Sequence, residues 1–140
     1  MIEYTIGPMA KLITVRMAGV TDFDELSRHI QRLWDDPEFD PTFDTLCKMD
    51  NEAQFRVSGV SSRGARLLEA WVKRRGQVKW AIVAPQESQR LIANIVFSNV
   101  RLEPVTVRVF FNEHAALEWL QEGHPNRLRA ETGQLQTAVG

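Results

Sequence analysis

Residues 73–85 read KRRGQVKWAIVAP, and this stretch decides the fold class. It begins with three basic residues followed by Gly76, a pattern typical of the last turn of a helix and of the glycine that ends it. Val78–Ala84 is then almost continuously apolar, which indicates a strand of a parallel sheet that is buried on both faces. Pro85 ends that strand. A helix that leads directly into a buried strand favours the α/β class.

The chain before this stretch continues the alternation of helices and strands. Apolar residues at helical spacing predict a helix over Ser58–Arg75, and the short run Thr45–Met49 before it is predicted as a strand. A second amphipathic helix is predicted over Asp22–Asp35. We expect Thr21 to cap it, because acidic residues follow in the first turn, where they complement the helix dipole.

The chain after Pro85 repeats the pattern once more. Helical spacing predicts a helix over Gln86–Asn99, and Val105–Phe111 is predicted as the last strand. Asn112 is expected to cap a final helix over Glu113–Gln121. Residues 123–140 are polar and contain no aromatic side chain, so they are predicted to form a loosely attached tail.

Two alternating runs at the start of the chain complete the sheet. Ile2–Ile6 and Leu12–Val20 lie on either side of the turn residues Gly7-Pro8, which predicts a β-hairpin. The full order is then β-β-α-β-α-β-α-β-α. It predicts one α/β domain over residues 1–122, built on a five-stranded mixed sheet with the hairpin at its edge.

The predicted sheet has two unlike faces. Several strands alternate polar and apolar residues, which a sheet fully covered on both faces would not require. We therefore expect most helices to pack on one face. The polar face would be a solvated surface with cross-strand charge pairs, or else a partner surface or dimer interface. The polar positions are Glu3, Thr5, Thr14, Arg16, Lys48, Asp50, Thr106 and Arg108.

Composition limits the classes of function. The chain has 140 residues, 44% of them hydrophobic, and a net charge of −1, so it has no general attraction for nucleic acid or an anionic membrane. Cys47 is the only cysteine, which excludes an intramolecular disulfide. No signal peptide is recognised, and no apolar run reaches the ~20 residues that span a bilayer, so a cytoplasmic location is expected.

The sequence offers no motif of a known catalytic chemistry. A phosphate-binding loop, a dinucleotide glycine fingerprint, a nucleophile elbow and a helical zinc-protease motif are all missing from it. His29, His114 and His124 are expected to be solvated, and Cys47 to be a small buried residue. The acidic loop 35–44 lacks the glycine and the final glutamate of a calcium loop. We therefore expect a protein that binds without catalysis, with no cofactor and no metal.

Two regions remain as candidate functional surfaces. The first is the expected helix start, where Ser58, Ser61, Ser62 and Arg63 could meet an anion or a phosphate, or simply cap the helix. The second is the rim beyond the carboxyl ends of the parallel strands, a common place for ligands in α/β sheets. It includes Asp50 and Asn112.

A basic group and the tryptophans are open to two interpretations each. Lys73, Arg74 and Arg75, with Lys79 nearby, could bind a phosphate or an acidic partner, but a helix end also favours such residues. The tryptophans are expected in the core and not on a nucleotide-stacking surface. They are Trp34, Trp71, Trp80 and Trp119.

Three segments resemble the SpoIIAA-like proteins of the STAS superfamily, which are related to anti-sigma-factor antagonists. They are the loop Asp35–Asp44, the strand Trp80–Pro85 and the ending Val109–Leu120, which reads VFFNEHAALEWL. The resemblance covers residues 1–122. It implies a βα superhelix with a hairpin at the sheet edge.

The resemblance also implies a function. Regulatory members of that superfamily are phosphorylated on a serine of an Asp-Ser-Ser/Thr-Gly element at the second helix, which releases a partner. The nearest match here is Val60–Gly64, with Ser61 and Ser62, where Val60 replaces the aspartate and Arg63 precedes the glycine. The first hypothesis is thus a STAS-like protein-interaction or regulatory module, with another protein or a second copy of the chain as partner. The second is a binder or sensor of a small amphipathic or anionic ligand, including a lipid-like one, at the strand-end rim.

Overall fold

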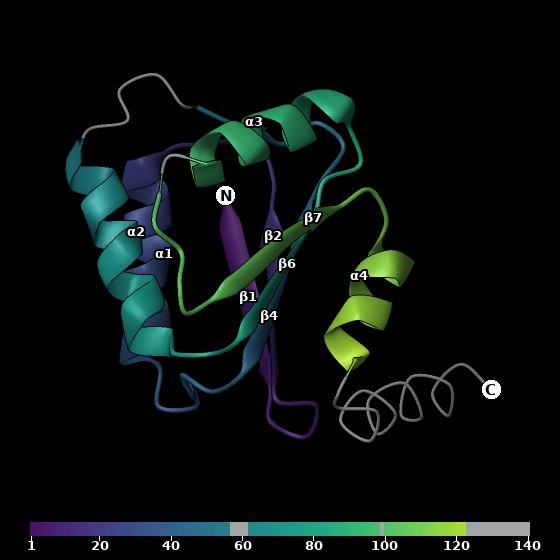
Figure 1. The fold of residues 1–140 in the computed structure, drawn as a ribbon. Coiled ribbons are helices and arrows are strands. Elements are labelled where there is room, and N and C mark those ends of the chain that lie inside the picture. The colour runs from purple at the N-terminus through teal and green to yellow at the C-terminus, as the bar shows by residue number, and fades with distance from the viewer. Residues whose placement is uncertain (57–61, 99, 123–140) are drawn as a thin grey trace.

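The computed structural model describes residues 1–56, 62–98 and 100–122 and shows a mixed sheet with helices on both faces (Figure 1). The main sheet has the strand order β1-β2-β4-β6-β7. Its strands are β1 (Ile2–Gly7), β2 (Leu12–Met17), β4 (Asp44–Met49), β6 (Lys79–Val83) and β7 (Thr106–Phe110). The helices are α1 (Phe23–Asp35), α2 (Ser62–Arg75), α3 (Glu87–Ser98) and α4 (Glu113–Gln121).

Strand pairing confirms the predicted mixed sheet with a hairpin edge. β1 and β2 are antiparallel, with Tyr4 opposite Val15, whereas the pairs β2–β4, β4–β6 and β6–β7 are parallel. Each parallel step contains a helix, as the alternation of the sequence predicts. The most apolar strand, β6, lies between β4 and β7 and is buried at four of its five positions.

The prediction of one strand over Leu12–Val20 is wrong. The strand stops at Met17, and Gly19 adopts a positive φ of 67°, a conformation that favours glycine. The chain then turns into β3 (Val20–Thr21), which pairs in parallel with β5 (Gln54–Phe55) in a separate two-stranded sheet. This small sheet was not predicted from the sequence.

The N-cap of α1 is one residue later than predicted. Asp22 accepts a hydrogen bond from the Glu25 backbone N–H at 2.9 Å, whereas Thr21 belongs to β3 and is 1% exposed. The cap of α4 is confirmed, because Asn112 Oδ1 accepts from the Ala115 N–H at 2.8 Å. The helix predicted from Ser58 is α2, which begins at Ser62, and residues 57–61 before it lie outside the described ranges.

Two hydrophobic clusters lie on opposite faces of the sheet. The larger one joins the apolar face to α1 and α2 and includes Val96 and Phe97 of α3, so three of the four described helices share this face, as predicted. Of the described helices, α4 alone covers part of the other face, as Figure 1 shows. The smaller cluster beneath it contains Ala10, Leu12, Leu46, Ala81, Val83, Ala116, Trp119 and Leu120.

The uncovered part of that second face carries exposed charge pairs. Arg16 lies 3.7 Å from Glu3, and Lys48 lies 3.5 Å from Glu113 of α4. Pairs as exposed as these contribute little to stability, so the face has the character of a solvated surface. No helix of the described ranges is long and apolar enough to cross a membrane.

Candidate functional site

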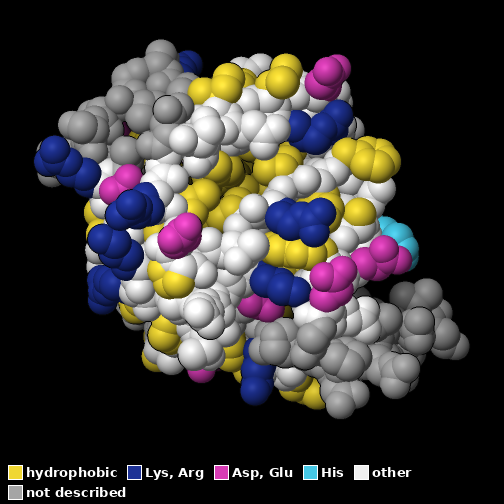
Figure 2. All heavy atoms as spheres, viewed as in Figure 1, with side chains coloured by type: hydrophobic (Ala, Val, Ile, Leu, Met, Phe, Trp, Pro, Cys, Tyr) yellow, Lys and Arg dark blue, Asp and Glu magenta, His cyan; other side chains and the backbone are white. Residues whose placement is uncertain are grey.

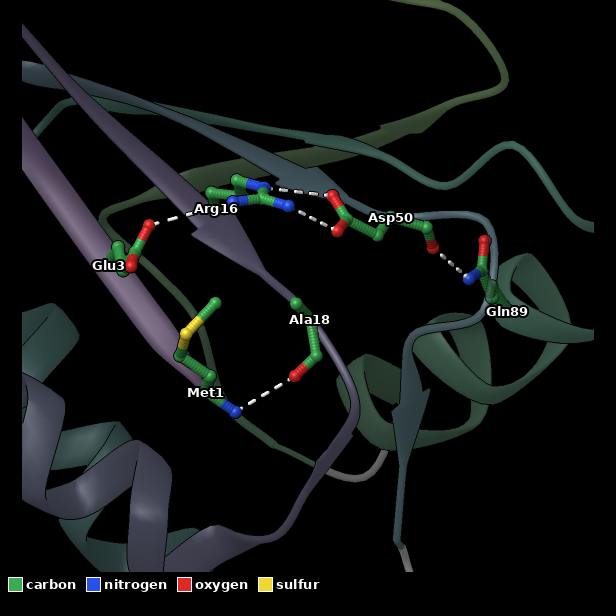
Figure 3. A network of polar contacts seen from close by, with 6 residues as sticks. All are labelled: Met1, Glu3, Arg16, Ala18, Asp50 and Gln89. Carbon is green, nitrogen blue, oxygen red and sulfur yellow. Dashed lines mark hydrogen bonds and ion pairs between the residues drawn. The ribbon is translucent and has the colours of Figure 1, made fainter.

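Asp50, expected at the strand-end rim, is held by an arginine of the neighbouring strand. Its carboxylate accepts from Arg16 Nη2 at 2.7 Å and from Arg16 Nε at 3.0 Å. This paired hydrogen bond lowers the pKa of Asp50 below its ordinary value. Figure 3 shows Arg16 between Glu3 and Asp50. Asp50 is therefore engaged within the protein and is not a free rim carboxylate.

Of the other predicted site residues with a described side chain, Asn112 does not join Asp50 in one site. Asn112 uses its side chain to cap α4. Ser62 and Arg63 are the first two residues of α2, and Ser58 and Ser61 fall outside the described ranges. Within the described part of the chain, no hydrogen bond links Asp50 to Asn112.

The buried Gln89 fastens the start of α3 to the turn after β4. Its Nε2 donates to the carbonyls of Asp50 and Ala53, both at 2.8 Å, and the first of these contacts appears in Figure 3. Its Oε1 accepts from the Gln86 N–H at 3.0 Å. The Gln89 side chain thus holds the start of α3 against the segment that carries Asp50 and helps to set the distance between this helix and the sheet.

A largely apolar cavity of about 90 Å³ lies beneath α3. Figure 2 shows hydrophobic side chains in a hollow between α3 and β7. Most of its wall is aliphatic, aromatic or sulfur-containing. The wall comprises Met17, Leu26, Cys47, Met49, Ala53, Gln54, Phe55, Leu68, Trp80, Ile82, Ser88, Gln89, Ile92, Ala93, Val96 and Phe97.

A second cavity of about 30 Å³ adjoins the first on the same face of the sheet. The two share Met17, Leu26, Cys47 and Trp80 as wall residues. The remaining wall of the smaller cavity comes from β1, β2, β4, α1 and α2, and comprises Ile2, Val15, His29, Ile30, Leu33, Thr45 and Trp71. The two cavities therefore lie next to each other, one beneath α3 and the other in the layer between α1, α2 and the sheet.

Three residues of these walls each have a buried nitrogen atom without a hydrogen-bond partner among the described residues. The atoms are Nε1 of Trp80, Nε1 of Trp71 and Nδ1 of His29. Each side chain is at least nine-tenths buried. An unpaired buried donor costs about 1–3 kcal/mol, and most native proteins avoid this. Polar groups of this kind in an apolar wall are typical of ligand pockets, where a few of them orient the ligand.

His29 corrects the expectation of a solvated histidine. It lies on the buried face of α1, 5% exposed, with its ring edge-on to Tyr4 at 5.6 Å. Burial lowers its pKa to about 4, and the nearby Arg32 acts in the same direction. His114 is exposed as expected and pairs with Glu118 at 2.9 Å, and His124 falls outside the described ranges.

Cys47 confirms the expectation of a small buried residue. It lies in β4 and contributes to the walls of both cavities. Burial raises the pKa of its thiol to about 12, so it is uncharged at neutral pH. The tryptophans also lie in the core as predicted: Trp71, Trp80 and Trp119 are buried, and Trp34 is half-buried.

Three of the four predicted basic residues make contacts that stabilise the fold, and the fourth, Lys73, is exposed. Arg75 is 4% exposed and donates to the carbonyls of Pro41 and Phe43, and the distance to Pro41 is 3.1 Å. Arg74 stacks over the ring of Trp34, with its guanidinium carbon 4.1 Å from the ring centre. Lys79 Nζ donates to the carbonyl of Trp119 at 2.8 Å, at the end of α4. These cations are thus engaged with helix and loop carbonyls or with a ring.

The acidic loop is organised by local hydrogen bonds. Asp36 accepts from the Tyr4 hydroxyl at 2.7 Å, and Asp40 accepts from the Thr42 hydroxyl at 2.7 Å. The hydrogen bond from the Glu38 backbone N–H and then that from Tyr4 lower the pKa of Asp36, and the hydrogen bonds from the hydroxyl and backbone N–H of Thr42 lower the pKa of Asp40. In the described part of the chain, no three His, Cys, Asp or Glu side chains are grouped to hold a metal ion.

Sequence reasoning missed the cavity, although some of its residues carried a signal. Leu26, His29 and Leu33 have the spacing of one helical face, which would have placed His29 inside. The run Leu91–Phe97 in α3 has apolar residues on both sides of the helix, more than one buried face requires.

Comparisons with known proteins supply no analogue for this site. The chain matches no protein-family model, and neither the curated proteins nor the solved structures yield a significant match.

Proposed function

We propose that this protein binds a small, mainly apolar molecule in the space between α3 and the sheet. The observation that carries the proposal is the pair of adjoining cavities, about 90 and 30 Å³, with unpaired indole N–H groups in largely apolar walls. The proposal develops the second hypothesis from the sequence, but it places the ligand in the helix–sheet interior instead of at the strand-end rim and makes it mainly apolar instead of amphipathic or anionic. Burial of apolar ligand surface would supply the main driving force.

Cavity volume favours a ligand near the size of benzene over a lipid-like one. An engineered protein cavity of about 150 Å³ binds benzene, and the larger cavity, of about 90 Å³, is of the same order. A longer chain would require α3 to move away from the sheet, against the hydrogen bonds of Gln89. We therefore regard small rings and short branched chains as the preferred class.

Binding without catalysis is part of the same proposal. Cys47 and His29 are the titratable side chains in the described walls of the two cavities. Burial raises the pKa of the Cys47 thiol to about 12 and lowers the pKa of His29 to about 4. Both groups are thus neutral near pH 7, and neither supplies a nucleophilic thiolate or a charged acid.

The proposal is tested with benzene as the probe and two helical alanines that differ in location. Ala93 of α3 lies in the cavity wall, whereas Ala70 of α2 is exposed and belongs to neither wall. We expect Ala93→Leu to fill the cavity and weaken benzene binding at least ~10-fold, because a larger side chain takes up the ligand space. Ala70→Leu should bind like the wild type. Titration followed by protein NMR measures the affinity of the three proteins.

Two results would count against ligand binding. One is a wild-type protein whose spectrum does not change at saturating benzene. The other is equal binding by Ala93→Leu and Ala70→Leu, which would place the benzene elsewhere on the protein. Unfolding curves of both variants verify that each remains folded.

The STAS-like βα superhelix is our proposal for the finer description of the fold. The hairpin edge and the sequential parallel strands β2, β4, β6 and β7 support it. A protein partner at Ser58–Ser62 stays a prediction from the resemblance, and a homodimer and a cytoplasmic location stay predictions from the sequence pattern. Ser58 and Ser61 lie outside the described ranges, so the cavity is the better supported site.

A further inference from the structure

The indole N–H of Trp80 is the polar group best placed to recognise a polar atom of a ligand in the cavity. Trp80 contributes to the walls of both cavities and is 8% exposed. Its Nε1 has no acceptor among the described residues. Its ring is fixed from two sides, by Trp71 at 5.5 Å and Phe97 at 5.4 Å between ring centres, both edge-on. The donor is therefore buried, unpaired and held in place.

The wall around Trp80 favours a neutral ligand over a charged one. It contains no Lys, Arg, Asp or Glu side chain among the described residues. Arg75 is close to the ring of Trp71, but its guanidinium donates to the Pro41 carbonyl and to Thr45 Oγ1. A carboxylate in such a wall would lose its hydration without gaining a counter-charge, which is strongly unfavourable.

We infer that the cavity selects a neutral, benzene-sized molecule that carries a hydrogen-bond acceptor, and that Trp80 Nε1–H donates to this acceptor. The inference rests on the proposed function and adds the class of ligand and the residue that recognises it. A carbonyl or ether oxygen in a small ring satisfies both conditions. Trp71 Nε1, unpaired in the wall of the smaller cavity, is a second donor for a ligand that reaches further inward.

The test compares two probes of nearly equal shape, cyclopentanone and methylenecyclopentane, of which only the ketone can accept a hydrogen bond. Trp80→Phe removes the donor and keeps an aromatic ring. Trp34→Phe is the matched control, because Trp34 Nε1 is also unpaired but Trp34 belongs to neither cavity wall. Dissociation constants come from NMR titration, and the tryptophan indole N–H signals are followed in the same spectra.

We expect Trp80→Phe to weaken cyclopentanone binding about fivefold and to change methylenecyclopentane binding by less than about twofold, as the loss of one hydrogen bond predicts. Trp34→Phe should leave both affinities unchanged. In the wild type, cyclopentanone should move the Trp80 indole proton downfield, and methylenecyclopentane should not. This signal decides the matter even if Trp80→Phe does not fold.

The possible failures separate the inference from the proposed function. Equal effects of Trp80→Phe on both probes, or an unmoved Trp80 signal with bound ketone, would overturn the inference and leave ligand binding intact. Tighter binding of isobutyrate than of either neutral probe at pH 7 would overturn the neutral class. If none of the probes binds and benzene does not bind either, the proposed function itself fails.

Discussion

At the scale of single residues, the most informative side chain is the buried His29. The unfolded chain holds its imidazole at an ordinary pKa of 6.5, whereas the folded protein lowers that pKa to about 4. Below pH 6.5 the imidazole of the unfolded chain therefore binds a proton, whereas the buried imidazole of the folded protein stays neutral until the pH approaches 4. Protonation of His29 in the unfolded state therefore leaves the free energy of unfolding unchanged above pH 6.5 and lowers it as the pH falls towards 4.

This difference in pKa predicts that the protein loses stability in acid, mainly because of His29. Between pH 7 and pH 4 the free energy of unfolding should fall by up to about 3 kcal/mol, from the shift of His29 alone. His29→Leu, of similar size and without a charge, should lose much less over that range. Urea unfolding at several pH values measures both proteins.

The carboxyl groups do not change the difference between the wild type and His29→Leu. The pKa values of Asp36, Asp40 and Asp50 are lowered from 3.8, so the stability that these carboxyls contribute begins to fall as the pH approaches that value from above, but this loss is the same in both proteins and cancels in the comparison. A wild type and a His29→Leu variant with parallel stability curves between pH 7 and 4 would show that His29 titrates normally.

At the scale of elements, Arg75 joins the end of α2 to the loop before β4. It donates to Pro41 O at 3.1 Å, to Phe43 O and to Thr45 Oγ1 at 3.2 Å. Its guanidinium also faces the rings of Phe39 and Trp71. Burial lowers its pKa to about 10, so it remains charged at neutral pH.

Two adjacent arginines allow a matched test of this joint. Arg75→Ala should lower the free energy of unfolding by about 3 kcal/mol, because it leaves buried carbonyls without a donor. Arg74→Ala removes only an exposed contact with Trp34 and should cost less than about 1 kcal/mol. Denaturant unfolding measures both variants. Losses of equal size would mean that the loop does not depend on Arg75.

At the scale of the whole molecule, the sequence predicts the layers better than it predicts the spaces between them. The nearly continuous apolar run of β6 and the alternation of β1 and β2 were enough for the strand types and the hairpin edge. Each is a local pattern, because the spacing of apolar residues along the chain reports directly which side of a strand is buried. β3 and β5 were not predicted because each strand has two residues, which is too few to show an alternation of polar and apolar side chains.

The cavity could not be predicted for a different physical reason. Its walls combine residues from α1, α2, α3, β5 and the sheet, and its volume is the small remainder after all of them have packed. A displacement of α3 by one side-chain layer would close or open it. Sequence spacing reports which side of a helix faces inward, as Leu26 and Leu33 show for α1, but not how closely two layers approach.

The placement of α4, the one described helix on the second face of the sheet, has a consequence for how the protein opens. Within the described ranges, α4 packs on the smaller cluster, and Lys79 holds its end through two carbonyls, those of Trp119 and Glu122. The strands beneath it are covered on their other side by α1, α2 and α3 and do not need α4 to stay paired. Amide hydrogens of α4 should therefore exchange with deuterium well before those of β4 and β6, in a partial opening that leaves the cavity side closed. Simultaneous exchange of all three elements, measured by mass spectrometry, would instead show one cooperative unit.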